Sequence, residues 1–221
     1  GQTVTVTHGR RKISGQSNLL GVQGAKASGV AMAVADMLGL DAKAIGESAR
    51  AIRNVPGRMQ VLPGVKGSIL LDDTYNATPI AVQAALDVVY ATKAPQKIAI
   101  LGSMNELGDY TKEAHQIVGS YCNPKHLDLV ITVGDDAMRW LAPAARAQGC
   151  VVHTCQSPYS AGKYALERLQ KGALVLAKGS QNGVFTEEAL KKLLLHPADA
   201  EKLVRQTAGW RRIKARQFKD L

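Results

Sequence analysis

Two adjacent aspartates mark the stretch of this sequence with the clearest chemical potential. An apolar run, Ser68 to Leu71, leads directly into Asp72 and Asp73 and then into the polar residues Thr74 to Asn76. In α/β proteins, ligands bind beyond the carboxyl ends of strands, so acidic groups between a buried strand and a helix indicate a binding site. The alternative is that one aspartate caps the following helix, a position that Asp favours.

Two more polar loops follow predicted strands later in the chain. Gly102–Gly108 comes after a strand at 97–101, and Lys178–Gly183 comes after a strand at 173–177. Because parallel strands place their carboxyl ends at one edge of a sheet, we expect these loops and the aspartate loop to form a single rim. Acids in two loops and a lysine in the third favour a binding edge over three separate helix caps.

The elements that must position these loops alternate along the chain. Strands spaced about 25 to 30 residues apart, with helices between them, predict an α/β fold with a mostly parallel sheet and helices on both faces. The predicted strands are 68–73, 97–101, 128–133, 150–153 and 173–177. The predicted helices are roughly 79–92, 110–122, 135–147, 159–171, 186–195 and 199–208.

The first 57 residues have a different pattern. Residues 3–7 alternate Thr and Val, which predicts a strand with one buried face, and the turn at 9–12 leads toward a second strand. An apolar helix rich in small residues is expected at 18–38 and a shorter helix at 41–53. Pro56 and Gly57 end this part, so we expect a mainly helical domain at 1–57 and the α/β domain at 58–221.

Composition excludes several classes of protein. Hydrophobic residues make up 46% of the chain, no apolar run reaches the roughly 20 residues of a membrane span, and no signal peptide is evident. The three cysteines show no metal-binding spacing, so we expect a cytoplasmic protein without disulfides or a metal site. We expect core positions for the cysteines, and packing roles for Trp140 and Trp210.

The net charge of +10 is concentrated at the ends of the chain. Residues 1–14 carry three basic and no acidic residues, and residues 201–221 carry seven basic against two acidic ones, which leaves only +2 for the body. The basic C-terminal tail is therefore interpreted as a solvated helix or frayed end. Few aromatic residues and a nearly neutral body argue against nucleic-acid binding.

Familiar catalytic motifs are missing from the sequence. It contains no P-loop GxxxxGK[ST], no GxGxxG after the first strand, no GxSxG and no Cys–His pair that would indicate a nucleophile. His115 lies in an apolar helical pattern, which favours a packing or capping role over a catalytic one. The rim therefore does not constitute a complete catalytic machine.

Four motifs, in order, resemble the C-terminal region of the Mur ligases. They are Pro56-Gly-Arg-Met59, Leu71-Asp-Asp-Thr-Tyr-Asn-Ala77, Leu101-Gly-Ser-Met-Asn-Glu-Leu-Gly108 with Ala114-His115, and Ala177-Lys-Gly-Ser180. The resemblance extends over about residues 15–195. It implies that 1–57 is the end of the family's central ATPase domain, with the P-loop upstream, and that 58–221 is the Rossmann-like C-terminal domain with a basic helical tail. The chain then looks like a fragment.

The resemblance also implies an activity. It is greatest to the branch that uses ATP with Mg²⁺ to add D-Ala-D-Ala to UDP-N-acetylmuramoyl tripeptide, with release of ADP during peptidoglycan precursor synthesis. We expect a monomer that contributes substrate contacts, with the Mg²⁺ ligands mostly outside this chain. The chain alone should be inactive.

Residue roles follow from the matched motifs. For ATP phosphate and ribose, the resemblance implies Arg58, Asp73, Tyr75 and Asn76. For the incoming amino substrate it implies Lys178, Gly179, Ser180 and Gln181, and the second rim loop contributes Asn105 and Glu106. Two residues depart from the family pattern. Ser103 replaces the usual Asp, and Gln181 replaces a common Arg, which an amide cannot match in pairing with a carboxylate.

Other interpretations remain open from the sequence. The chain could be a stand-alone Rossmann-like nucleotide-binding module without ligase activity, or it could belong to a Mur ligase of different specificity. A third interpretation is a nucleic-acid-binding module that uses both basic ends of the chain. An in-frame upstream GxxxxGK[ST] loop would support the ligase and exclude the stand-alone module.

Overall fold

The structure is a computed structural model that describes residues 1–219 of the chain, and it separates into two compact units. The first unit is Gly1–Val55, and the second begins at Pro56. Each unit has its own hydrophobic core.

The first unit is a hairpin with two helices. Strands β1 (Gln2–His8) and β2 (Arg11–Ser17) pair antiparallel, followed by α1 (Gly21–Met37), α2 (Ala42–Ser48) and the 3₁₀ turn Ala49–Ala51. Its core is small and consists of Val4, Ile13, Met32, Ile45 and Ala49. Both predicted helices are present, and the alternating Thr and Val residues form a strand as expected. Because so few residues are buried, α1 leaves several large apolar side chains exposed.

The second unit is built on a six-stranded sheet with the order β3-β4-β8-β5-β6-β7. The strands are β3 (Gln60–Pro63), β4 (Ile69–Asp73), β5 (Lys97–Gly102), β6 (Leu129–Val133), β7 (Val152–Cys155) and β8 (Leu174–Lys178). Only β3 runs antiparallel to its neighbour; the other pairings are parallel. The mostly parallel α/β sheet predicted from the sequence is thus confirmed. The short edge strand β3, which contains Pro63, was not predicted.

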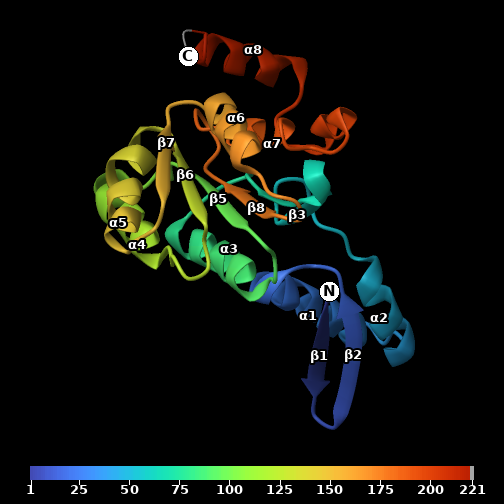
Figure 1. The fold of residues 1–221 in the computed structure, drawn as a ribbon. Helices are drawn as coiled ribbons and strands as arrows, with labels where there is room; N and C mark the ends of the chain where they lie inside the picture. Colours follow the sequence, from blue (N-terminus) through green and yellow to red (C-terminus); the bar gives the residue numbers. More distant parts are fainter. Residues whose placement is uncertain (220–221) are drawn as a thin grey trace. The chain divides into compact units, whose positions relative to one another are not determined.

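Helices cover both faces of this sheet (Figure 1). One face carries α3 (Pro79–Ala91), α4 (Thr111–Tyr121), the π-helical turn Ala137–Leu141 and α5 (Ala142–Ala147). The other carries α6 (Pro158–Arg168) and α7 (Glu187–Lys191). The strands β5, β6 and β8 are almost completely buried, as expected for parallel strands covered on both sides. Short 3₁₀ turns occur at Val65–Gly67, Gly108–Tyr110 and Pro197–Lys202.

The C-terminal part of the chain differs from the sequence prediction. The prediction of a helix at 199–208 is wrong. A 3₁₀ turn spans Pro197–Lys202, and the last helix, α8, spans Ala208–Gln217. The chain is interrupted at Arg205, whose φ of 57° is incompatible with a right-handed helix. The helix expected at 186–195 ends at Lys191, because Leu193 and Leu195 bond instead to the backbone near Pro63 and Val65.

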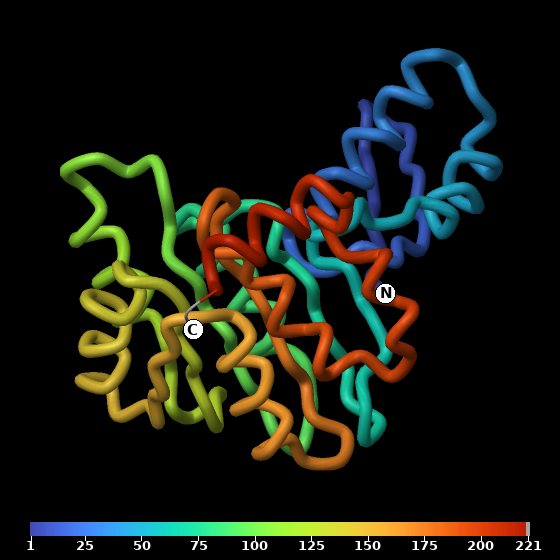
Figure 2. Tube along the Cα trace, turned by 90° about the horizontal axis from the view of Figure 1, so that it is seen from above, coloured from blue at the N-terminus to red at the C-terminus, as the bar shows by residue number. Residues whose placement is uncertain are grey.

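Helix α8 lies over α6 and α7 rather than extending into solvent (Figures 1 and 2). Trp210 and Phe218 contact the ring of Phe185, with ring centroids 5.9 and 6.3 Å away, and Phe218 also meets Tyr159 of α6. Phe185 is only 1% exposed. The packing role expected for Trp210 is confirmed, whereas the expectation of a solvated tail is wrong. None of the helices formed by residues 1–219 has the length and apolarity needed to cross a membrane.

Candidate functional site

The two adjacent aspartates point to opposite faces of the sheet. Side chains alternate along a strand, so Asp72 shares a face with Leu70 and Asp73 shares the other face with Leu71. The parallel register places Asp73 directly beside Lys178 at the end of β8, although the two residues are 105 positions apart in sequence. The first and third rim loops therefore meet at this point, as the sequence predicted.

Asp73 and Lys178 form an ion pair that we call the rim pair. The Lys178 ammonium lies 2.5 Å from Oδ2 of Asp73 and also donates to the carbonyl of Asn76 at 3.0 Å. The other Asp73 oxygen accepts from the backbone N–H of Met59 at 2.9 Å. The Lys178 side chain is 3% exposed, but that of Asp73 is 14% exposed, so Asp73 is the more accessible member of the pair. Each carboxylate oxygen can accept more than one hydrogen bond, which leaves Asp73 able to receive a hydroxyl.

Asp72 is instead a buried structural residue. Its Oδ1 accepts from the hydroxyl of Thr74 at 2.6 Å and from the Thr74 N–H at 3.2 Å, which closes the turn after β4. Burial, with a smaller contribution from the nearby carboxylates of Glu187 and Asp73, raises the pKa of Asp72 to about 6. Neither aspartate caps α3, because the side chain of Thr78 is its N-cap.

Arg58 and Tyr75 meet beside the rim pair. The guanidinium carbon of Arg58 lies 4.2 Å from the centroid of the Tyr75 ring, a cation–π geometry. Tyr75 is 42% exposed and its N–H donates to the carbonyl of Gly57 at 3.0 Å, which ties the loop back to the segment that carries Arg58. A cation, a partly exposed tyrosine and a carboxylate thus occupy one part of the rim.

The second rim loop is joined to the third by Asn105. Its side-chain amide donates to the carbonyls of Gln181 and Asn182, both at 2.7 Å, and its N–H donates to Oγ of Ser180 at 2.9 Å. Ser180 is 1% exposed and also donates to the carbonyl of Ala77 in the first loop, at 3.3 Å. All three rim loops therefore meet at Ser180, so the predicted single rim is present.

Three other residues singled out in the sequence have distinct surroundings. The Ser103 hydroxyl accepts from the N–H of Ala137 at 3.0 Å and so connects the second loop to the helical segment that follows β6. Glu106 is exposed and has a left-handed φ of 64°. Gln181 is half-buried, and its backbone carbonyl accepts a hydrogen bond from the side-chain amide of Asn105.

His115, in helix α4, supports the second rim loop. Its Nε2 accepts from the N–H of Met104 at 2.9 Å and its Nδ1 lies 2.7 Å from the carbonyl of Thr111, so Nδ1 carries the proton of a neutral ring. Burial lowers the pKa of His115. The expected packing or capping role is confirmed.

Gly179 is explained by close backbone approach. A Cβ on Gly179 would lie 3.2 Å from the Cα of Gly102 and would collide with the side chain of Thr186. The ends of β5 and β8 can therefore come together only because both positions are glycine.

Four buried charged residues, which we call the tail cluster, were not predicted from the sequence: Glu187, Glu188, Arg205 and Lys214. Arg205 binds Glu187 in a bidentate manner at 2.9 and 2.6 Å, and the Lys214 ammonium lies 2.9 Å from Glu187 and 2.6 Å from Glu188. The four side chains are between 0% and 7% exposed. The two basic residues were interpreted as part of a solvated tail because nothing in the local sequence reports a partner about 20 residues away.

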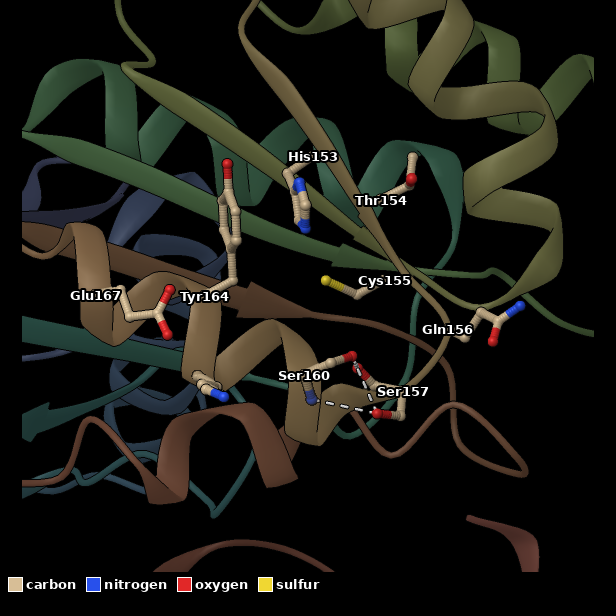
Figure 3. Close-up of a pocket in the computed structure, with 9 residues that line it drawn as sticks. His153, Thr154, Cys155, Gln156, Ser157, Ser160, Tyr164 and Glu167 are labelled. Carbon is tan, nitrogen blue, oxygen red and sulfur yellow. Dashed lines mark hydrogen bonds between the residues drawn. The ribbon is translucent and has the colours of Figure 1, made fainter. Parts of the chain in front are cut away.

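A separate hollow of about 440 Å³ lies between β7 and α6 (Figure 3). Its most distinctive feature is the stack of the His153 and Tyr164 rings, with centroids 3.5 Å apart. None of the residues predicted for the rim lines it. The lining residues are His153, Thr154, Cys155, Gln156, Ser157, Ser160, Lys163, Tyr164 and Glu167.

Within residues 1–219, no three His, Cys, Asp or Glu side chains come together in a group that could hold a metal ion. The rim residues therefore supply no such group of three. They do offer polar and aromatic groups suited to a nucleoside, namely the accessible Asp73 carboxylate and the exposed Tyr75 ring.

Comparisons with known proteins lead to the Mur ligases. The profile of the family described as Mur ligase, glutamate ligase domain, matches residues 57–181. A UDP-N-acetylmuramoyl-tripeptide--D-alanyl-D-alanine ligase from Synechocystis is 32% identical over 176 residues, which is 80% of this chain but 38% of that protein. A UDP-N-acetylmuramoyl-L-alanine--L-glutamate ligase from Xanthomonas campestris is 30% identical over 162 residues, 71% of this chain and 33% of that protein.

A solved structure extends the similarity to three dimensions. The MurF ligase from Thermotoga maritima, crystallised in complex with ADP, matches with a TM-score of 0.67 and 26% identity. The match covers 87% of this chain and 42% of that one. In both sequence and structure, this chain spans less than half the length of these similar proteins.

Proposed function

Because this chain belongs to the Mur ligase family, we propose that it is the C-terminal part of an ATP-dependent ligase that adds D-Ala-D-Ala to UDP-N-acetylmuramoyl tripeptide. In this proposal residues 1–57 are the end of the central ATPase domain, and the domain from Arg58 onward closes on it. The observation that carries the proposal is the meeting of the rim pair with Arg58 and Tyr75 at the carboxyl end of β4.

The proposed nucleotide side of the rim consists of Arg58, Asp73, Tyr75 and Asn76. Asp73 accepts hydrogen bonds from the ATP ribose through its accessible carboxylate, and Arg58 provides positive charge toward the phosphates. The ADP held by the similar Thermotoga ligase supports the use of ATP here. In this proposal the Mg²⁺ ligands lie mostly outside this chain.

The proposed amino-substrate side is the loop formed by Lys178, Gly179, Ser180 and Gln181, with Asn105 and Glu106 beside it. Ligation by this family's chemistry requires the amine to reach an activated carboxylate while water is excluded. The hydrogen bonds from Asn105 and Ser180 keep this loop in a fixed position next to the nucleotide side. Fixed positioning of two substrates on one rim is the contribution that this chain makes to catalysis.

The test is a ligase assay with the protein encoded by the complete gene. We expect an in-frame GxxxxGK[ST] loop upstream, and ADP release that depends on both D-Ala-D-Ala and UDP-N-acetylmuramoyl tripeptide. The 221-residue chain alone should release no ADP, because it has no phosphate-binding P-loop. Activity with L-glutamate and UDP-N-acetylmuramoyl-L-alanine instead would assign the specificity of the Xanthomonas relative. An upstream sequence without a P-loop would contradict the proposal and favour a stand-alone nucleotide-binding module.

A further inference from the structure

The C-terminal segment makes direct contacts with the first rim loop. The Arg205 guanidinium donates to the carbonyl of Thr74 at 2.6 Å and to the carbonyl of Tyr75 at 3.2 Å. These two carbonyls immediately follow Asp73 in the chain. Arg205 lies 130 positions away in sequence, so only the docked tail brings it to the loop.

Arg205 is itself held rigidly. Its other hydrogen bonds form a bidentate pair with Glu187, which is fully buried, and its own carbonyl accepts from the Lys214 ammonium at 2.8 Å. A planar guanidinium can bind a carboxylate and backbone carbonyls at the same time, which an ammonium cannot do with the same geometry. The loop is thus connected through one side chain to the buried tail cluster.

The same segment also reaches the third rim loop. The side-chain amide of Gln217, at the end of α8, donates to the carbonyl of Gly183. Phe185, two residues further along the chain, is covered by Trp210 and Phe218. Contacts at both loops come from residues 205–218, so the docked segment is bonded to the first and the third rim loop.

We propose that Arg205 is a positioning residue for nucleotide binding. It holds the Thr74–Asn76 loop in the conformation that presents Asp73 and Tyr75 to the nucleotide, so the docking of the C-terminal segment sets the affinity for ATP. This inference rests on the proposed nucleotide role of the loop. Arg205 does not contact the nucleotide itself and acts only through the loop.

The experiment compares wild type with Arg205→Lys and Arg205→Ala in the complete enzyme, which includes the P-loop domain that we propose to lie upstream. Arg205→Lys retains a positive charge beside Glu187 and protects the fold, but it loses the two-sided hydrogen bonding. Arg211→Ala is the matched control, because Arg211 is exposed on α8. Amide hydrogen exchange at Thr74 and Tyr75 reports the loop, and NMR titration with ATP reports binding.

We expect both Arg205 variants to raise loop exchange about tenfold or more and to weaken ATP binding about five- to tenfold, more for Ala than for Lys. Exchange in β5 should not change in Arg205→Lys, and Arg211→Ala should match wild type. Unchanged loop exchange in Arg205→Ala, or faster exchange with unchanged ATP affinity, would overturn the positioning role alone. If wild type shows no ATP-induced shift at residues 73–76, the nucleotide role of the loop fails, and the positioning role fails with it.

Discussion

The rim pair and the tail cluster both join distant parts of the chain by ion pairs, but they differ in exposure. Asp73 of the rim pair retains access to solvent, with 14% of its side chain exposed. The tail cluster is 0% to 7% exposed and satisfies two carboxylates with two cations. A partly open pair can exchange partners with a ligand, whereas a closed cluster can only hold segments together. This difference is consistent with our proposal that the rim binds substrates and that the tail cluster supports it.

The largest effect is expected from Lys214→Ala in the tail cluster. The substitution leaves Glu187 with one cation and weakens the pairing of Glu188, and removing one partner of a buried ion pair costs about 3–5 kcal/mol. The free energy of unfolding, measured by urea denaturation, should fall by that amount. Arg216→Ala is the control: Arg216 is exposed on the same helix, and its removal should change stability by less than about 0.5 kcal/mol. Equal stabilities for the two variants would contradict the distinction between the two regions.

The second prediction concerns the pH dependence of the unfolding free energy that Asp72 causes. Its folded pKa of about 6 lies above the ordinary value of 3.8, so the folded state holds the proton more tightly than the unfolded state. The contribution of Asp72 to stability is therefore greatest below about pH 4 and is lost as the pH rises to about 6. The difference between pKa 3.8 and about 6 corresponds to about 3 kcal/mol of unfolding free energy.

Asp72→Asn should remove this loss, because the amide does not titrate. The measurement is the difference in unfolding free energy between variant and wild type at several pH values from 4 to 7. Asp135→Asn, at an exposed position, should leave the profile unchanged. A pH profile that Asp72→Asn does not flatten would mean that Asp72 is ionised in the fold at low pH.

His115→Ala should have a smaller effect on stability. The N–H of Met104 loses its acceptor, which costs about 1–3 kcal/mol. Burial lowers the pKa of His115, so the wild type should also lose stability as the pH falls below about 6.5, and the variant should lose less. Thermal unfolding between pH 5 and 8 measures both effects, with the exposed His196→Ala as control. If His115→Ala lost no more stability than the control, His115 would not support the second rim loop.

Much of the sheet could be predicted from the sequence because its signals are local. Runs such as Ile98–Leu101 and Leu129–Val133 are apolar, are bounded by polar loops, and form strands at the expected places. Strand β7 was predicted at 150–153 but lies at Val152–Cys155, because the N–H of Cys150 still bonds to Ala145 at the end of the preceding helix. The register that sets Asp73 beside Lys178 follows from the parallel pairing of β4 and β8.

The tail cluster could not be predicted because its cause is not local. Glu187 and Glu188 resemble ordinary acidic residues at the start of a helix, and Lys214 resembles an exposed residue of a basic helix. Their burial depends on α8 packing over Phe185, which also requires the left-handed conformation at Arg205. Charge counting along the chain gives no information about such tertiary pairing.

The most direct test of the central claim is the ATP affinity of the complete enzyme with Asp73→Asn. This substitution keeps the shape of the side chain but removes its charge, its ion pair with Lys178 and one acceptor of the proposed ribose hydrogen bonds. Losing about 1–3 kcal/mol of such bonding corresponds to a roughly five- to 150-fold weaker Kd for ATP. Asp72→Asn in the same folded enzyme should bind ATP nearly as wild type does. Equal ATP affinity for Asp73→Asn and wild type would contradict the account and leave both aspartates with structural roles only.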